Sequence, residues 1–183
     1  ALVSAANIPQ RPLTILGIDP GSRFMGFGVI VKAGNRLTHV ESGVIKVNLK
    51  DEIHQRLRTI HAGVVELLER HKPDHVAVEK MFFAKDAVAA MKLGQARGVT
   101  LLAIADKGSR FFEYSPNEVK MAVSGYGHAD KEQVARLVSL VLGVKDFDRS
   151  DASDALAIAI CHANTYTYIQ RGLPASREKG LGA

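Results

Sequence analysis

The chain has 183 residues, of which 46% are hydrophobic, and it carries a net charge of +5 at pH 7 with a pI near 9.4. We expect a single domain, because halving a chain of this length would leave two pieces with marginal cores. Its one cysteine, Cys161, excludes a disulfide framework and a zinc site built on thiolates, and it favours a reducing compartment. The basic charge favours a polyanionic partner.

Membrane association and secretion are not expected from the sequence. No apolar stretch approaches the roughly 20 residues that a membrane-spanning helix needs. Residues 1–12 have neither a basic start nor a long apolar run, which argues against a signal peptide. We therefore expect a cytoplasmic protein without contact to a membrane.

The pattern of apolar residues along the chain is typical of an α/β protein. Between residues 52 and 71 the apolar positions recur in steps of three and four, which predicts an amphipathic helix. Gly34-Asn35 is a hairpin signal, and Ser115-Pro116 is a helix start. The predicted strands span residues 13–19, 24–32, 36–47, 74–79 and 111–114. The predicted helices span residues 52–71, 85–107, 115–123, 130–142 and 150–166.

Four carboxylates border apolar runs, where an unpaired charge costs several kcal/mol. Asp19 and Glu79 each end a run that is expected to form a buried strand. Asp151 and Asp154 stand three residues apart, just before the apolar run of the last predicted helix, and therefore share one face of its first turn. No arginine or lysine is expected beside the four acids in a fixed ion-pair pattern.

These acids come from three remote segments and offer oxygen ligands, which hard divalent cations prefer. Two Mg²⁺ ions would balance their charge of roughly −4. A pair of ions about 3.5–4 Å apart polarises a phosphodiester, generates hydroxide and stabilises the leaving oxygen. The alanines of the run 155–159 would let the last helix approach the sheet closely. The four acids together indicate a metal-dependent nuclease.

Each acid also has an ordinary structural interpretation when it is taken alone. An aspartate before Pro-Gly is commonly a turn residue, and an aspartate at a helix start is commonly a cap. Asp146 and Asp148 could compete for the metal, but they are set aside because they are expected in the loop before the last helix. His71 and His75 are four residues apart, but the proline between them rules out a helical zinc pair, and His162 is expected to be a packing or surface residue.

Three stretches of the sequence resemble the RuvC family of bacterial Holliday-junction resolvases, which have a ribonuclease-H-like fold. The stretches are Ile15-Leu16-Gly17-Ile18-Asp19-Pro20-Gly21-Ser22, Lys92-Leu93-Gly94-Gln95-Ala96-Arg97-Gly98 and Asp151-Ala152-Ser153-Asp154-Ala155-Leu156-Ala157-Ile158-Ala159. The resemblance runs from about residue 13 to 166. It implies an α/β, ribonuclease-H-like domain over 13–168 with a five-stranded mixed sheet flanked by helices. Residues 1–12 are expected to form an N-terminal extension, and 169–183 a disordered tail.

The resemblance places the metal-binding tetrad of the family on Asp19, Glu79, Asp151 and Asp154. Lys120 and Lys131 match basic residues that line the resolvase cleft, where an ammonium group offsets the charge of the transition state. Without the resemblance, both lysines would be taken as solvated helix residues.

Aromatic and basic residues just after Glu79 complete the expected site. The position of Phe82 contacts an unpaired or unstacked base in the family, and an aromatic platform or wedge can hold a junction open. Phe82 could equally be a core residue on the pattern alone. We include Lys85, Lys120 and Lys131 with Phe82 among the candidates for DNA binding.

The resemblance implies an endonuclease that resolves four-way DNA junctions by paired symmetric nicks, in recombination and repair. Two Mg²⁺ ions per active site are expected, with Mn²⁺ as a possible substitute. The expected partners are junction DNA, a second copy of the chain, and the branch-migration proteins RuvA and RuvB. A two-fold dimer would contact through the helix over 85–107, whose small and apolar residues allow a close approach.

Three other functions stay open on the sequence alone. Asp19-Pro20-Gly21-Ser22 after a strand also resembles the first phosphate motif of actin-like and sugar-kinase-like ATPases. Those proteins need two such domains, and this chain has room for one. A DNA-binding module without catalysis is disfavoured by the intact tetrad, and a ribonuclease-H-like enzyme acting on other structured nucleic acid remains an alternative.

Overall fold

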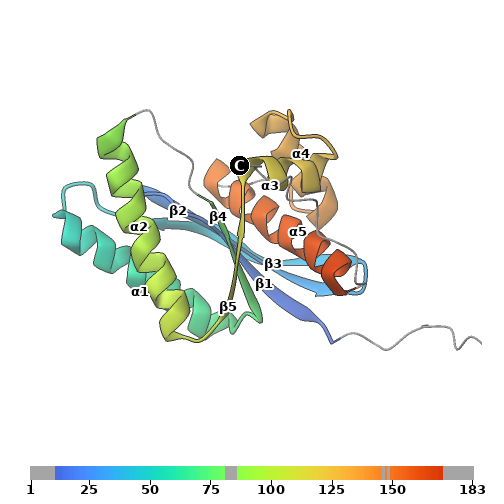
Figure 1. Cartoon of the computed structure of the whole chain (residues 1–183), viewed down its shortest axis with the longest axis horizontal. Helices are drawn as coiled ribbons and strands as arrows, with labels where there is room; N and C mark the ends of the chain where they lie inside the picture. Colours follow the sequence, from blue (N-terminus) through green and yellow to red (C-terminus); the bar gives the residue numbers. More distant parts are fainter. Residues whose placement is uncertain (1–10, 81–85, 146, 148, 171–183) are drawn as a thin grey trace, which may run out of the picture.

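The computed structural model describes residues 11–80, 86–145, 147 and 149–170, with side chains up to 167. These residues form a five-stranded sheet in the order β3-β2-β1-β4-β5, with helices on both faces (Figure 1). The strands are β1 Leu13–Asp19, β2 Phe24–Ala33, β3 Arg36–Lys46, β4 His75–Glu79 and β5 Arg110–Tyr114. The helices are α1 Ile53–His71, α2 Ala87–Asp106, α3 Pro116–Ser124, α4 Lys131–Leu142 and α5 Ser150–Gln170. The expected mixed five-stranded α/β architecture is confirmed.

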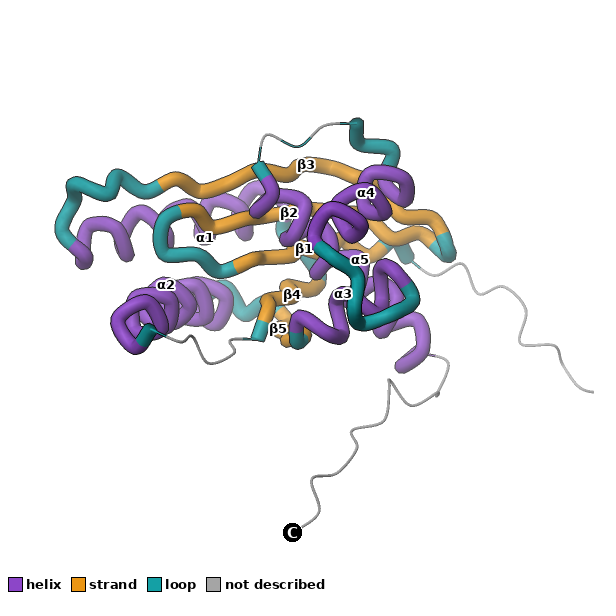
Figure 2. Tube along the Cα trace, turned by 90° about the horizontal axis from the view of Figure 1, so that it is seen from above, coloured by secondary structure: helices purple, strands orange, loops and turns teal. Residues whose placement is uncertain are grey.

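The sheet is antiparallel on one side and parallel on the other. β1 pairs with β2 and β2 with β3 in antiparallel register, and the β2–β3 hairpin turns at Gly34, whose φ of 58° suits a glycine. β1 pairs with β4 and β4 with β5 in parallel register. Figure 2 shows β1, β2 and β3 side by side as the longest part of the sheet. The parallel pairing brings the ends of β1 and β4 to the same edge.

Each face of the sheet has its own hydrophobic core. Alternate residues of β1 divide between them, because successive side chains of a strand point to opposite faces. Ile15 packs in the core that includes α3, α4 and α5, whereas Leu16 and Ile18 pack in the core that includes α1 and α2. Figure 1 shows the two groups of helices on opposite sides of the sheet.

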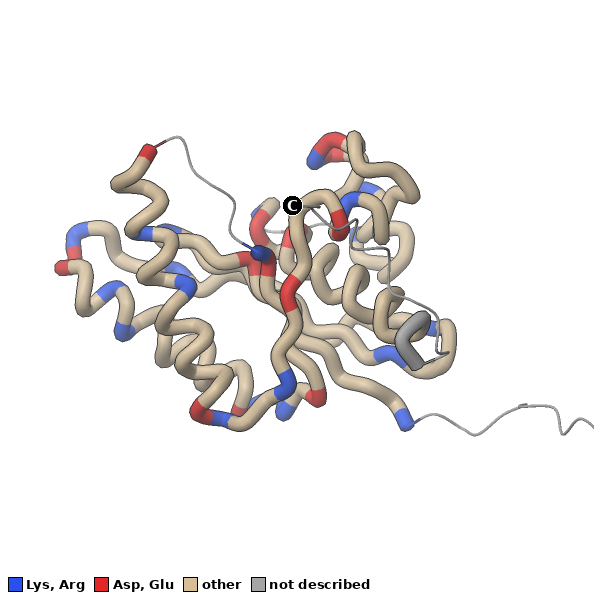
Figure 3. The backbone as a smooth tube through the Cα atoms, viewed as in Figure 1, with Lys and Arg blue, Asp and Glu red and all other residues tan. Residues whose placement is uncertain are grey.

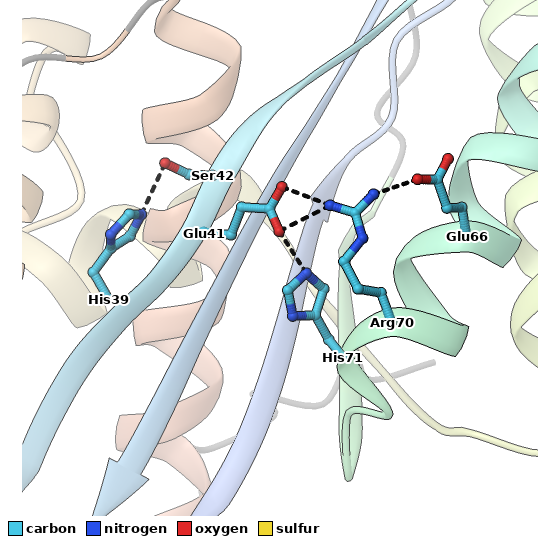
Figure 4. Close-up of polar contacts among 6 residues, drawn as sticks. All are labelled: His39, Glu41, Ser42, Glu66, Arg70 and His71. Carbon is cyan, nitrogen blue, oxygen red and sulfur yellow. Dashed lines mark hydrogen bonds and ion pairs between the residues drawn. The ribbon is translucent and has the colours of Figure 1, made fainter.

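Polar side chains hold the edge strand β3 against α1 (Figure 4). The carboxylate of Glu41 accepts hydrogen bonds from Arg70 Nη1 at 3.0 Å, and it lies 2.7 Å from His71 Nε2. Arg70 also pairs with Glu66, one turn earlier on α1. His39 Nε2 lies 3.0 Å from Ser42 Oγ within β3. His71 therefore has a structural partner in this network.

Helix α2 corrects one expectation from the sequence. It is long and apolar enough to cross a membrane by length and composition, although the core helix of a soluble protein passes the same test. One face of α2 is buried through Ala96 and Ala103, whereas Val88, Met91 and Leu102 are exposed. The apolar composition of α2 thus comes from two faces, one in the core and one at the surface.

Candidate active site

Two of the four carboxylates end neighbouring parallel strands. Ile18 of β1 pairs with Val78 of β4, so the residues that follow them, Asp19 and Glu79, lie at the same edge of the sheet. Strand alternation turns both side chains to the face that α5 covers, since Gly17, two residues before Asp19, packs against α5. The expected position of both acids at strand ends is confirmed.

The other two carboxylates are brought in by α5, which lies on the sheet with its backbone close to that of the strands. A Cβ atom on Gly17 would lie 2.1 Å from the carbonyl oxygen of Ala155. A Cβ atom on Gly26, which pairs with Asp19 across β1 and β2, would lie 2.0 Å from the carbonyl oxygen of Asp151. Real Cβ contacts are never this short, so the first turn of α5 can reach the edge of the sheet only because both positions are glycines.

The convergence of the acids is visible in their electrostatics. Burial first, and then the nearby charges of Glu79, Asp154 and Asp151, together raise the pKa of Asp19 to about 8, while the charge of Lys131 opposes the shift. The pKa of Glu79 is also raised, first by burial and then by Asp154. Figure 3 shows acidic positions gathered between the two groups of helices. The four acids thus lie near enough to one another for their charges to interact.

Two cations pair with this cluster, which corrects the expectation that none would. Lys131, at the start of α4, donates from Nζ to Asp154 Oδ2 at 3.3 Å. Arg149, just before α5, donates from Nε to Asp151 Oδ2 at 3.2 Å. The charge of Asp154 raises the pKa of Lys131. Neither pair could be predicted from the sequence, because one joins two different helices and the other depends on how the chain enters α5.

The comparisons with known proteins decide the family. The family model described as "Crossover junction endodeoxyribonuclease RuvC" matches residues 15–162. The chain belongs to the RuvC family. The resemblance noted in the sequence is therefore confirmed, and the actin-like ATPase alternative is set aside.

Several curated relatives in the RuvC family are similar along most of their length. The crossover junction endodeoxyribonuclease of Geobacter sulfurreducens is 48% identical over 84% of this chain and 93% of the relative. That of Parvibaculum lavamentivorans is 46% identical over 93% of this chain and 97% of the relative. The structure titled "T. thermophilus RuvC in complex with Holliday junction substrate" superposes with a TM-score of 0.80 at 39% identity, over 86% of this chain and 96% of that one.

A yeast mitochondrial Holliday junction resolvase shares the fold alone. It superposes with a TM-score of 0.62 at 11% identity, over 86% of this chain and 80% of that one. Together with the sheet order and the RuvC structure, this likeness confirms the expected ribonuclease-H-like fold.

RuvC nucleases depend on divalent metal ions, and the residues of this site suit such ions by type. All four are carboxylates, and the raised pKa of Asp19 marks negative charge that a cation would relieve. Within the described part of the chain, no three acidic, histidine or cysteine side chains stand close enough to hold an ion as they are placed. Asp154 pairs with Lys131 and Asp151 pairs with Arg149, in each case through the Oδ2 atom of the aspartate.

The other candidate residues of this RuvC chain differ in whether they contact the four acids. Lys131 reaches the carboxylates, whereas Lys120, half-buried on α3, has no ion pair with any of the four described acids. Phe82 and Lys85 lie outside the described residues. The alternative metal candidates Asp146 and Asp148 lie outside them too.

A buried chain of polar side chains behind the site was not predicted. Tyr114, which pairs with Glu79 across β4 and β5, places its hydroxyl 2.7 Å from His162 Nδ1. His162 Nε2 lies 2.8 Å from His75 Nδ1. Burial first, and then the charges of His75 and Arg110, lower the pKa of His162 to about 3, so this ring stays neutral. His162 was expected to be a packing or surface residue, and it is buried. Its partners could not be predicted from the sequence because they lie on separate strands.

Proposed function

We propose that this chain is a metal-dependent endonuclease that resolves four-way DNA junctions by paired symmetric nicks, in recombination and DNA repair. The observation that carries the proposal is the convergence of Asp19, Glu79, Asp151 and Asp154 at one edge of a ribonuclease-H-like sheet. Membership of the RuvC family and the likeness to a RuvC structure with a Holliday junction substrate support it.

The four carboxylates would hold two Mg²⁺ ions, and Mn²⁺ is expected to substitute for them. When bound, such a pair of ions activates water and stabilises the leaving oxygen of the phosphodiester. Asp19 and Glu79 are fixed by the ends of adjacent strands, so they would set the position of the site. Asp151 and Asp154, one helical turn apart on α5, would complete it from the other layer.

Lys131 is the cation best placed to act beside the reacting phosphate. Its ammonium group lies 3.3 Å from Asp154 Oδ2, and its side chain is 80% exposed, so it can turn toward bound DNA. An ammonium there would offset the charge that develops on the phosphate oxygens. Lys120 would act at the cleft wall, and Phe82 and Lys85 would contact the DNA strands beside the crossover.

The active form is proposed to be a two-fold homodimer, because two opposed strands must be nicked and a C2 dimer presents two equivalent sites. Partnership with RuvA and RuvB and a cytoplasmic location follow from family membership as further proposals. The nuclease domain is proposed to span 13–168, with an N-terminal extension over 1–12 and a tail over 169–183.

Substitution of Asp154 by asparagine tests the site against a purely structural role. Asp154→Asn keeps the shape of the side chain and removes one charge from the cluster. We expect junction cleavage with Mg²⁺ to fall by at least about 100-fold, the scale of losing one preorganised electrostatic group. Junction binding should persist, because affinity rests mainly on contacts to phosphates. Cleavage assays and gel-shift binding measure the two effects.

The same variant also distinguishes a metal-ligand role of Asp154 from a helix-capping role. Asparagine caps a helix about as well as aspartate does, so a capping role predicts wild-type cleavage. The metal-free variant should melt at the wild-type temperature or slightly above it. Neutralising one of the four acids removes its repulsion with the other three. Cleavage at the wild-type rate would overturn the assignment of Asp154.

A further inference from the structure

Arg149 joins the start of α5 to the start of β2. Its guanidinium carbon lies 3.6 Å from the centroid of the Phe24 ring, and its Nε donates to Asp151 Oδ2 at 3.2 Å. Phe24 is the first residue of β2, and Asp151 is the second residue of α5. One side chain thus links an aromatic ring on the sheet to a carboxylate of the site.

The two contacts restrict Arg149 in different ways. Stacking on the ring fixes the plane of the guanidinium group, because the positive charge is attracted to the face of the aromatic ring. The charge-assisted hydrogen bond then fixes the direction of the Asp151 carboxylate. Since the bond uses Oδ2, the other oxygen of Asp151 is left to bind a ligand. An ion pair as exposed as this one adds little stability, so orientation is its main physical effect.

The cation beside Asp154 is held less firmly. The side chain of Lys131 is 80% exposed, against 39% for Arg149. Among the described residues, no aromatic ring stacks on Lys131. The two acids of α5 therefore pair with different kinds of cation. Arg149, beside Asp151, is held against the Phe24 ring, whereas Lys131, beside Asp154, is free to turn.

We propose that Arg149 is a positioning residue that orients Asp151 for a divalent cation, with Phe24 as the clamp that holds the guanidinium group. The inference rests on the proposed metal-dependent function and adds a residue pair to it. A hydrogen-bonding partner behind a metal ligand usually strengthens metal binding, and its loss typically costs 10–100-fold in affinity. A cation that merely blocked the site would have the opposite effect when removed.

The test measures Mn²⁺ binding without DNA, from the electron paramagnetic resonance signal of the free ion. Arg149→Ala should weaken Mn²⁺ binding by about 10-fold. Phe24→Leu, which keeps an apolar side chain but removes the ring face, should weaken it less. The double variant should bind no more weakly than Arg149→Ala, because both changes break the same unit. Arg149→Lys should restore only part of the affinity, since an ammonium group lacks the planar donor.

Arg36→Ala serves as the matched control, because it removes one exposed positive charge at the first residue of β3 and should leave Mn²⁺ affinity unchanged. Tighter Mn²⁺ binding by Arg149→Ala, or affinity equal to that of the wild type, would overturn the proposal. A lower melting temperature with unchanged Mn²⁺ affinity would also overturn it, by leaving Arg149 a purely structural role. Wild-type protein that binds no Mn²⁺ dependent on Asp154 would instead contradict the metal-dependent function itself.

Discussion

At the scale of single residues, Asp19 shows that an acid placed for metal binding can lower the stability of the metal-free protein. Its carboxyl group is buried beside three other acids, which raises its pKa to about 8. In the metal-free protein the folded state therefore holds this proton more tightly than the unfolded chain does. Stability must then fall as the pH rises from about 4 to 8, where the unfolded carboxyl is already charged.

Asp19→Asn should remove this dependence. We expect the free energy of unfolding of the metal-free variant to exceed that of the wild type at pH 9 by roughly 1–3 kcal/mol, since one pKa unit corresponds to about 1.4 kcal/mol. The difference should shrink toward pH 4. Urea unfolding at both pH values, without metal, measures the effect.

Added Mg²⁺ provides the control for Asp19. The ion should stabilise the wild type by mass action and should stabilise Asp19→Asn much less. If the metal-free variant were less stable than the wild type at pH 9, Asp19 would be serving the fold rather than the metal site.

At the scale of elements, the site depends on how closely α5 lies on the sheet. Gly17→Ala would place a Cβ atom 2.1 Å from a backbone oxygen of α5, which cannot move without the whole helix. We expect a loss of roughly 1–3 kcal/mol in stability from this overpacking, together with weaker metal binding as Asp151 and Asp154 shift. Thermal melting and Mn²⁺ titration measure both effects.

Gly127→Ala is the control for crowding at a glycine. A Cβ atom there would meet only Met121, at 3.7 Å, which is an ordinary contact. This variant should melt close to the wild type. Wild-type stability and metal affinity in Gly17→Ala would show that the contact between α5 and β1 does not set the site.

The elements themselves could be predicted from the sequence because their signals are local. Ser115 and Asp130 each form a capping box at the start of a predicted helix. The largest error lies at the end of α5, which continues to Gln170 rather than stopping at 166. Tyr166, where the predicted helix ended, packs against the rings of His75 and His162, so the helix is still held by tertiary contacts at that point.

The candidate site could be predicted only in part. The acids were found because each borders an apolar run, and such borders are visible in sequence. The clamp of Arg149 on Phe24 and the buried contact of His75 with His162 join residues that are distant along the chain. No periodicity or motif encodes such pairs, because they arise only when α5 docks on the sheet.

At the scale of the whole molecule, the proposed dimer is expected to form through the exposed apolar face of α2. Val88, Met91 and Leu102 are each more than half exposed and follow helical spacing along one face. Met91→Glu should give a monomer in light scattering at micromolar concentration, because a buried charge opposes an apolar interface. Paired nicking should fall, while the melting temperature of the monomer stays near that of the wild type.

Leu140→Glu makes the same kind of change on α4, where the leucine is 72% exposed. This control should leave the oligomeric state as it is in the wild type. A wild-type protein that is monomeric and fully active would contradict the proposed dimer.

The measurement that tests the central claim most directly compares two DNA substrates of the same sequence, a synthetic four-way junction and a linear duplex, each incubated with the protein and Mg²⁺. We predict paired nicks on opposed strands of the junction and little cutting of the duplex. EDTA and Asp154→Asn should both abolish the nicks. Equal cutting of junction and duplex would contradict the assignment of this chain as a junction resolvase.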